Sequence, residues 1–256
     1  MEKKLEILRN DPWLEPYAEA ITGRHEDVIR KMEELTAETG GSLSQFANAY
    51  KYFGLHREKN GEWIFREYAP NATQIWLIGT FSDWKDDERY SLSPIGGGVW
   101  EAHFPADFIR NGDLYKMRVE WEGGSGERIP AYATRVVQDP DTHIFSAEVY
   151  APEMPYKFKI KKFNPDTKPL LIYECHIGMA QEEEKVGTYE EFRTKTLPRI
   201  AADGYNAIQI MAIQEHPYYG SFGYHVSSFY AASSRFGTPD DLKRLIDDAH
   251  QRGIAV

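Results

Sequence analysis

The sequence predicts a multidomain chain with an N-terminal helical segment, an all-β sandwich, and the first β-α-β-α-β part of a parallel fold. Three observations support this prediction. The 256 residues correspond to between one and two domains. Short strands separated by Gly, Pro and Asn turns fill the middle of the chain. Capped helices alternate with apolar runs near its end. We place the boundaries at residues 1–55, 56–150 and 151–256.

The N-terminal segment is predicted to be helical. Val28, Ile29, Met32 and Leu35 recur at the spacing of one helix face. Two glycines, residues 40 and 41, then end the helix. Between Pro12 and Tyr17 we expect an extended stretch that packs on a neighbouring surface.

Residues 56–150 are predicted to form a small sandwich, because its strands are short and closely spaced. In the clearest strand, residues 114–121, apolar and polar side chains alternate, as expected of a strand with one buried face. The four strands expected here are Trp63–Tyr68, Gln74–Gly79, Val99–Phe104 and Leu114–Trp121.

Residues 151–256 change to the pattern of parallel β/α units. We expect a buried strand over 170–175 and a second, covered on both faces, over 205–213. A capping box opens a helix at Thr188, and Pro198 should kink or shorten that helix. A second helix begins after Thr238, and residues 254–256 begin a third strand.

Composition and charge restrict the classes of partner. Thirty Lys and Arg against forty Asp and Glu give a net charge of −10. Nucleic acids and anionic membranes attract basic surfaces, so we expect neither as a partner, and a neutral substrate fits better. Cys175 is the only cysteine, which excludes an intrachain disulfide and a Cys-rich zinc site. We expect no signal peptide, no membrane-spanning segment and a cytoplasmic location.

The chemical motifs that are absent also restrict the function. No phosphate-binding glycine loop, no dinucleotide fingerprint, no metal-binding histidine pair and no nucleophile elbow are found in the sequence. We therefore expect neither a cofactor nor a metal.

An aromatic site is indicated in the sandwich. Trp84 follows a predicted strand on a loop, Trp100 begins the strand after a glycine run, and Lys116 lies on the polar side of its strand. A flat indole stacks on the C–H face of a sugar ring, and a lysine donates to its hydroxyls, so this set suits a neutral polyol. For Trp84, a core position and a ligand contact remain equally open. Trp76 and Trp121 are expected in the core.

A second candidate site is the loop over residues 214–225, which carries three Tyr, one Phe and two His. It follows a parallel strand, and parallel folds bind ligands at the carboxyl ends of their strands. The alternative is that these aromatic side chains pack on a neighbouring domain.

At these residues the chain resembles the glucan (glycogen or starch) branching enzymes of the α-amylase superfamily, glycoside hydrolase family 13. The longest run of resemblance is residues 207–239, AIQIMAIQEHPYYGSFGYHVSSFYAASSRFGTP. Shorter runs are YECHIGMA at 173–180, KVGTY at 185–189 and DPWLEPY at 11–17. FSDW at 81–84 and EYAP at 67–70 resemble a family 48 carbohydrate-binding module.

The resemblance implies an immunoglobulin-like sandwich followed by an incomplete (β/α)8 TIM barrel. It implies an enzyme that cleaves α-1,4-glucan and transfers the chain to a 6-hydroxyl, forming α-1,6 branches in glycogen or starch biosynthesis. The partner would be an α-glucan polysaccharide such as glycogen, amylose or amylopectin. Two alternatives stay open, namely a non-catalytic glycan-binding protein and a debranching relative.

The resemblance also assigns residues. The nucleophile Asp and the acid/base Glu are expected beyond Val256, so no catalytic residue is assigned, and the 256-residue chain alone is expected to be inactive. In similar enzymes the residue that matches Tyr224 stacks on the sugar at the cleavage point, with His225 beside it. The resemblance also implies glucan contacts in the module at Trp84, Lys116, Trp100, Tyr68, Ala69, Pro70, Gly96, Gly97, Gly98 and Val99.

Overall fold

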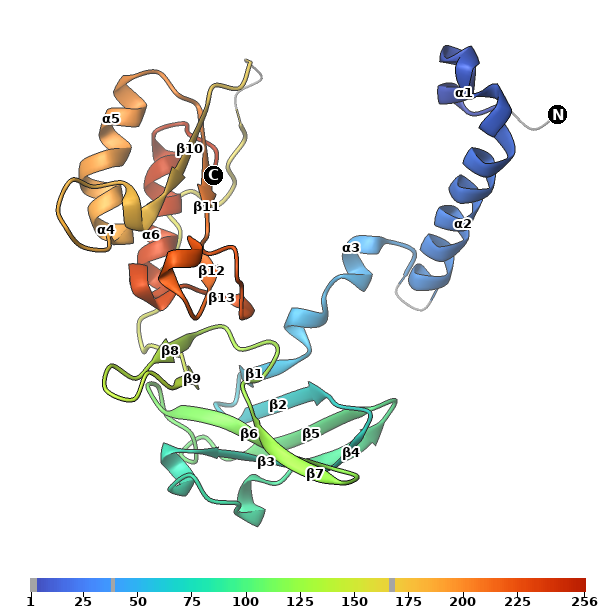
Figure 1. Cartoon of the computed structure of the whole chain (residues 1–256). Helices are drawn as coiled ribbons and strands as arrows, with labels where there is room; N and C mark the ends of the chain where they lie inside the picture. The colour runs from blue at the N-terminus through green and yellow to red at the C-terminus, as the bar shows by residue number, and fades with distance from the viewer. Residues whose placement is uncertain (1–3, 38–39, 166–168) are drawn as a thin grey trace. The chain divides into compact units, whose positions relative to one another are not determined.

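The computed structural model describes residues 4–37, 40–165 and 169–256 and separates into two compact units, residues 1–52 and 53–256 (Figure 1). The first unit is helical, with α1 (Glu6–Asn10), α2 (Ala18–Thr36), α3 (Leu43–Phe46) and the 3-10 turns η1 (Pro12–Tyr17) and η2 (Ala49–Lys51). The stretch expected to be extended is therefore a 3-10 helix. Asp11 caps it by accepting from the Trp13 amide at 3.0 Å, and Pro12 suits a first helical position.

The predicted apolar face of α2 is exposed. Val28, Ile29 and Met32 are between 39% and 56% exposed, and Leu8 is the only buried apolar side chain among the described residues of this unit. The spacing of the apolar residues thus predicted the helix correctly, but these residues do not form a buried face within the unit.

The second unit begins with two antiparallel sheets that enclose a common core (Figure 1). One sheet has the order β1-β2-β5-β4, and the other the order β3-β6-β9-β8, with β7 paired to β6. All four predicted strands are present, and β3 begins two residues earlier than expected. The bounds are β1 (Gly54–Arg57), β2 (Trp63–Tyr68), β3 (Ala72–Gly79), β4 (Ser93–Gly96), β5 (Val99–Phe104), β6 (Leu114–Trp121), β7 (Gly124–Arg128), β8 (Val136–Gln138) and β9 (Phe145–Glu148), with the 3-10 turns η3 (Thr80–Ser82) and η4 (Glu88–Tyr90).

Alternation along β6 separates the core from the surface. Tyr115, Met117 and Val119 are at most 9% exposed, whereas Lys116 and Arg118 lie on the other face. The core between the sheets also contains Phe65, Leu77, Trp100 and Phe104.

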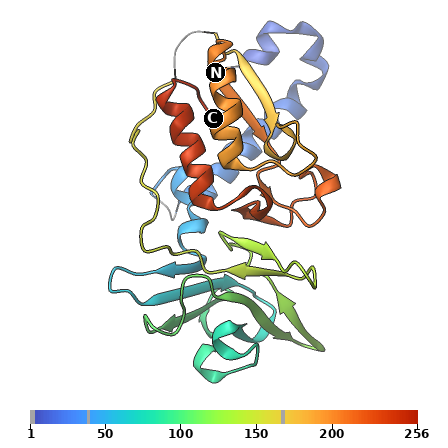
Figure 2. The same ribbon diagram turned by 90° about the vertical axis from the view of Figure 1, so that its left-hand side faces the viewer.

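Residues 172–256 form the start of a parallel β/α arrangement. β10 (Ile172–His176) pairs in parallel with β11 (Ala207–Met211), and Ala255 forms a parallel bridge to Ala207, so a third strand begins as expected. The helical segments of this region lie against these strands, and the first two are successive parts of one irregular helix that lies beside the third (Figures 1 and 2). They are α4 (Tyr189–Glu191), α5 (Leu197–Ala202) and α6 (Pro239–Gln251), with the short elements η5 (Ile177–Met179), β12 (Gln214–Glu215), η7 (Tyr219–Ser221), β13 (Ser228–Ala232) and η8 (Ser234–Phe236) between the regular ones.

The Thr188 capping box is present, and the helix it opens is irregular where a kink was expected. Between α4 and α5 the residues Phe192–Thr196 form a π-helical turn, η6, which ends two residues before Pro198. Proline has no amide hydrogen and crowds the preceding turn, which accounts for the wider winding there.

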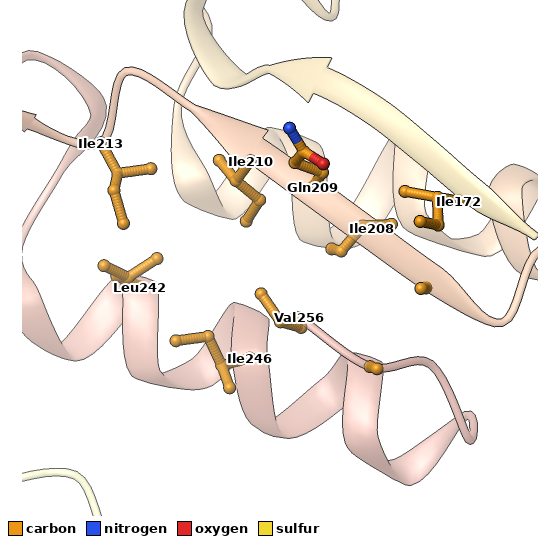
Figure 3. Close-up of a pocket in the computed structure, with 10 residues that line it drawn as sticks. Ile172, Ile208, Gln209, Ile210, Ile213, Leu242, Ile246 and Val256 are labelled. Atoms are coloured by element: carbon orange, nitrogen blue, oxygen red, sulfur yellow. The ribbon is translucent and has the colours of Figure 1, made fainter. Parts of the chain in front are cut away.

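The parallel strands were expected to be buried, and this expectation is wrong for the residues at the start of β10 and just before it. Leu170, Leu171 and Ile172 are 50% to 58% exposed, because β10 has only β11 beside it in the described sheet. A cavity of about 490 Å³ opens on this apolar surface, where Leu242 and Ile246 of α6 face Ile208, Ile210 and Ile213 (Figure 3). Its lining is almost wholly aliphatic, so it offers few groups to a polar ligand.

Candidate functional site

The turn after β3 presents Trp84 beside Lys116. The Trp84 amide donates to the Gly79 carbonyl at 2.9 Å, and both Asp83 and Trp84 have left-handed backbones, with φ of 52° and 60°. Such conformations are costly for residues other than glycine and are concentrated at functional sites. Trp84 is 40% exposed, which excludes the core position that the sequence left open. The Lys116 ammonium lies 5.8 Å from the centre of the indole and donates to Glu127 Oε2 at 2.9 Å.

A second group gathers where β2 and β5 meet. Tyr68 pairs with Val99, and the Ala69 amide donates to the Gly98 carbonyl at 2.8 Å. A Cβ at Gly98 would lie 2.9 Å from both Pro70 Cβ and Tyr68 Cε2, so the glycine turn closes directly against these side chains. Tyr68 is 56% exposed. The structure therefore brings together Tyr68, Ala69, Pro70, Gly96, Gly97, Gly98 and Val99, as one surface turn.

Trp100 differs from its neighbours and corrects an expectation. Its side chain is buried in the sandwich core, 6% exposed, and its Nε1 donates to the Ala69 carbonyl at 3.0 Å. The ring is thus not available to stack on a ligand. Through this hydrogen bond, Trp100 supports the turn from within the sandwich core.

The two groups lie at opposite ends of β3. Pro70 precedes the first residue of that strand by two positions, whereas Trp84 is bonded to its last residue, Gly79. Eight residues at about 3.3 Å per step place these ends about 23 Å apart. One sugar residue cannot span that distance, so the two groups cannot contact the same sugar.

Tyr224 and His225 lie on the loop after β11. Tyr224 is 77% exposed, and His225 is also exposed. Phe222 has a left-handed φ of 51°, and a Cβ at Gly223 would approach Ala212 Cβ to 2.2 Å, so only glycine fits there. The close approach holds the exposed tyrosine at the carboxyl end of a parallel strand.

A buried ion pair braces this loop from behind. Glu215 is fully buried and accepts from the Ser234 amide at 2.7 Å and from Arg235 Nη1 at 3.2 Å. The Arg235 guanidinium also donates to the backbone carbonyls of His216 and Pro217, the latter at 3.0 Å. One arginine thereby fixes three consecutive residues at the base of the loop.

His176, the last residue of β10, supports the loop from the side. It is 7% exposed, and its ring meets those of Tyr219, Phe222 and Phe236 edge-on, with centroids 5.6 to 6.1 Å apart. Neither ring nitrogen has a hydrogen-bond partner among the described residues, nor does His216 Nε2. Burial, and to a lesser extent the neighbouring His216, lower the pKa of His176, so this imidazole is neutral at pH 7.

The strand after the loop is anchored in the sandwich. Ala231 of β13 belongs to the sandwich core and is 1% exposed. Beside it, Tyr230 stacks on Tyr132 with ring centres 4.6 Å apart, and Tyr132 stacks on Phe53 at 5.3 Å. Arg135 Nη1 donates to the Gly237 carbonyl at 3.2 Å. Tyr224 is therefore part of a segment that is attached to the sandwich as well as to β11.

Residues 52–141 match the family model described as Carbohydrate-binding module 48 (Isoamylase N-terminal domain). The chain is 42% identical over 259 residues to the 1,4-alpha-glucan-branching enzyme of Aspergillus oryzae, covering 98% of this chain and 37% of that protein. The corresponding protein of Equus caballus is 38% identical over 258 residues, with 98% and 36% covered. The chain is therefore similar to the 1,4-alpha-glucan-branching enzymes along nearly its whole length.

The chain spans a little over a third of the length of the curated relatives it matches. Solved structures show its fold. A putative alpha amylase from Salmonella typhimurium aligns with a TM-score of 0.63 at 23% identity, covering 79% of this chain and 32% of that one. A pullulanase from Bacillus acidopullulyticus aligns with a TM-score of 0.64 at 16% identity, covering 79% and 28%. The resemblance noted in the sequence is thus confirmed.

The described residues contain no group of three His, Cys, Asp or Glu side chains that could hold a metal ion. In the same residues, no helix is long and apolar enough to cross a membrane.

Sequence reasoning missed the supports of the loop, namely Arg235, His176 and the Tyr132–Tyr230 stack. Of these supports, only His176 was indicated by the sequence, because it lies at the end of an expected strand.

Proposed function

We propose that this chain is the N-terminal part of a glucan branching enzyme, which cleaves α-1,4-glucan and transfers the released chain to a 6-hydroxyl to make α-1,6 branches. In this proposal residues 1–55 are a helical segment, residues 56–150 an immunoglobulin-like carbohydrate-binding module, and residues 151–256 the start of a catalytic (β/α)8 barrel. The observation that carries the proposal is the similarity to branching enzymes along 98% of the chain.

The geometry of the loop after β11 supports a substrate role for Tyr224. An exposed ring, held on a braced loop at the carboxyl end of a parallel strand, is positioned where β/α folds bind their substrates. Its flat face would stack on the sugar at the cleavage point, and the adjacent His225 would contact the same sugar. The stiffness of the loop would limit the entropy lost on binding.

The chemistry needs two further groups. Retaining transfer uses a carboxylate nucleophile and a carboxylic acid/base about 5 Å apart, and no residue of the present chain is assigned to either role. In this proposal both belong to the part of the enzyme that follows Val256. Transfer to a sugar hydroxyl also requires that water be kept from the intermediate, which the proposal leaves to the complete active site.

The sandwich would bind the same polysaccharide at a distance from the reaction. Trp84 with Lys116, and the turn formed by Tyr68–Pro70 and Gly96–Val99, are the proposed contacts with the glucan. Their separation of about 23 Å along β3 means that a helical or branched glucan could be held at two points. Two weak contacts on one ligand raise the overall affinity through effective concentration.

The test is a branching assay on the protein purified from its source by affinity for glycogen. After incubation with amylose, the α-1,6 linkages formed are counted by proton NMR. Tyr224→Ala should lower the branching rate by about tenfold or more, whereas Tyr224→Phe, which keeps the ring, should change it by less than about threefold. Glycogen binding without any α-1,6 linkage would instead identify a non-catalytic glycan-binding protein.

A further inference from the structure

A pocket of about 380 Å³ lies at the end of the sandwich where β3 leaves the sheet and β6 enters it. It is separate from the Tyr68 turn and contains neither Trp84 nor Lys116. Its lining includes the aromatic residues Phe81, Tyr90 and Phe108, which we call its floor, and the charged residues Arg89, Asp107 and Arg110, which we call its rim. Its size lies within the range of small-molecule sites.

The floor is a set of packed aromatic rings. Tyr90 is 4% exposed, and its ring centre lies 4.7 Å from that of Phe81 and 5.7 Å from that of Phe108. The Tyr90 hydroxyl donates to the Phe81 carbonyl at 3.4 Å. Tyr90 is thus buried beneath the pocket, and the partly exposed Phe81 and Phe108, which pack against the sandwich core, are the rings that a ligand can reach. Such a surface matches the C–H face of a sugar ring.

The rim carries polar groups of both signs. Arg89 is occupied by Asp87, with its Nη2 2.6 Å from Asp87 Oδ2. Asp113 is occupied as well, accepting from Thr80 Oγ1 and from the Arg110 amide at 2.7 Å each.

Two rim groups remain free. Within the part of the chain that the structure describes, the Asp107 carboxylate and the Arg110 guanidinium form no hydrogen bond or ion pair. They supply one strong acceptor and one forked donor. The two charges of opposite sign offset each other, so the rim gives no net attraction to an ion of either sign, whereas neighbouring hydroxyls can donate to Asp107 and accept from Arg110. The rim therefore favours a neutral polyol.

The pocket and Trp84 share one turn. Thr80 and Phe81 belong to η3, and the same turn closes when the Trp84 amide bonds to Gly79. Its last two residues, Asp83 and Trp84, are those with left-handed backbones. Thr80 and Trp84 are only four positions apart, so the pocket wall and the indole come from one short segment.

We propose that this pocket is a second subsite for a glucose residue of an α-glucan whose neighbouring residues stack on Trp84. The proposal rests on the proposed glucan binding by the sandwich and adds the residues Asp107 and Arg110 to it. It predicts that longer oligosaccharides gain affinity from the pocket and that short ones, confined to Trp84, do not.

The experiment is isothermal titration of the 256-residue chain with maltoheptaose and with maltotriose. The variant Asp107→Asn/Arg110→Met should bind maltoheptaose five- to tenfold more weakly and change maltotriose affinity by less than twofold. The matched control, Glu58→Gln/Lys59→Met in the exposed β1–β2 turn, should change neither affinity. Both pocket residues are exposed, and near-ultraviolet circular dichroism verifies that the variant is folded.

The outcomes separate the two proposals. If Trp84→Ala weakens maltoheptaose binding while the pocket variant binds like the unsubstituted chain, the subsite is refuted and glucan binding stands. If the unsubstituted chain binds neither sugar, the glucan-binding function of the sandwich is refuted, and the subsite with it.

Discussion

The Lys116 ammonium lies 5.8 Å from the ring centre of Trp84 and is held there by Glu127. Replacing Lys116 with Met keeps most of the aliphatic stem and removes the charge. We expect glucan affinity to fall about three- to tenfold, since a cation near an indole and a hydroxyl donor are both lost. Isothermal titration with maltoheptaose measures the change.

Glu127→Gln is the control for that variant. It removes the ion pair and leaves the ammonium in place, so affinity should fall by less than about twofold, because a pair whose carboxylate is 48% exposed contributes little. An equal loss in both variants would mean that the lysine acts through its ion pair rather than on the sugar.

The glycine turn beside Tyr68 gives a second prediction. At Gly98, which has φ of +79°, an added methyl would collide with Pro70 and Tyr68, so Gly98→Ala should lower the free energy of unfolding by about 2–4 kcal/mol and weaken glucan binding. Gly97 has φ of +59° with nothing within 4 Å of the added carbon, so Gly97→Ala should cost about 1 kcal/mol. Urea unfolding distinguishes the two, and equal costs would show that the turn can relax.

The buried pair behind the loop after β11 should matter far more than a surface pair. Arg235→Met leaves the fully buried Glu215 without its cation and should lower the free energy of unfolding by about 3 kcal/mol. In contrast, Arg30→Met in α2, where both partners of the ion pair are over 60% exposed, should change it by less than about 0.5 kcal/mol. Thermal unfolding of both variants tests this, and similar melting temperatures would exclude Arg235 as a brace.

The neutral, buried His176 predicts a stability that depends on pH. Its pKa in the folded chain is lowered by burial, with His216 nearby, so below about pH 6.5 the unfolded chain binds a proton that the folded chain does not. The free energy of unfolding should therefore fall as the pH drops from 6.5 to 5.5, by at most about 1.4 kcal/mol from this group.

His176→Met isolates that contribution. All other ionisable groups are present in both proteins, so the difference between the two pH profiles reports the removal of His176. Parallel profiles between pH 7.5 and pH 5.5 would show that the imidazole is protonated as easily in the folded chain as in the unfolded one.

The uncovered apolar surface of β10 predicts self-association of the 256-residue chain. Leu171 and Ile172 are 57% and 50% exposed, beside the aliphatic cavity of Figure 3. Leu171→Lys/Ile172→Lys should lower light scattering at equal concentration. Ile95→Lys, at a residue 49% exposed in the sandwich, should not. If both substitutions have the same effect, the association does not depend on this surface.

Much of the fold followed from local patterns in the sequence. Alternation predicted β6 and its buried face, and caps predicted α4 and α6. These features depend on neighbouring residues alone, which is why one sequence suffices for them. The exposure of Trp84 did not follow from the sequence, because it depends on the left-handed turn that precedes it.

The supports of the site depend on residues far apart in the chain. Glu215 and Arg235 are twenty positions apart. Asp247 lies 91 positions from Tyr156, whose hydroxyl donates to it at 2.6 Å. Nothing in the sequence separates Asp247, which is fully buried, from the exposed acids of other helices. Burial raises the pKa of its carboxyl, and hydrogen bonds from Tyr156 and two backbone amides outweigh that effect and lower it.

The packing of Ala231 and Tyr230 into the sandwich has a consequence for recombination and protein engineering. A carbohydrate-binding module is commonly treated as a cassette that can be cut out at a linker and exchanged. Here a cut near residue 150 would leave β13 without the core that buries Ala231 and without the ring on which Tyr230 stacks. The natural point of exchange is instead the junction near residue 52, before the unit that holds both the sandwich and the loop of Tyr224. A chimera that changes the sandwich should therefore carry its own β12 and β13.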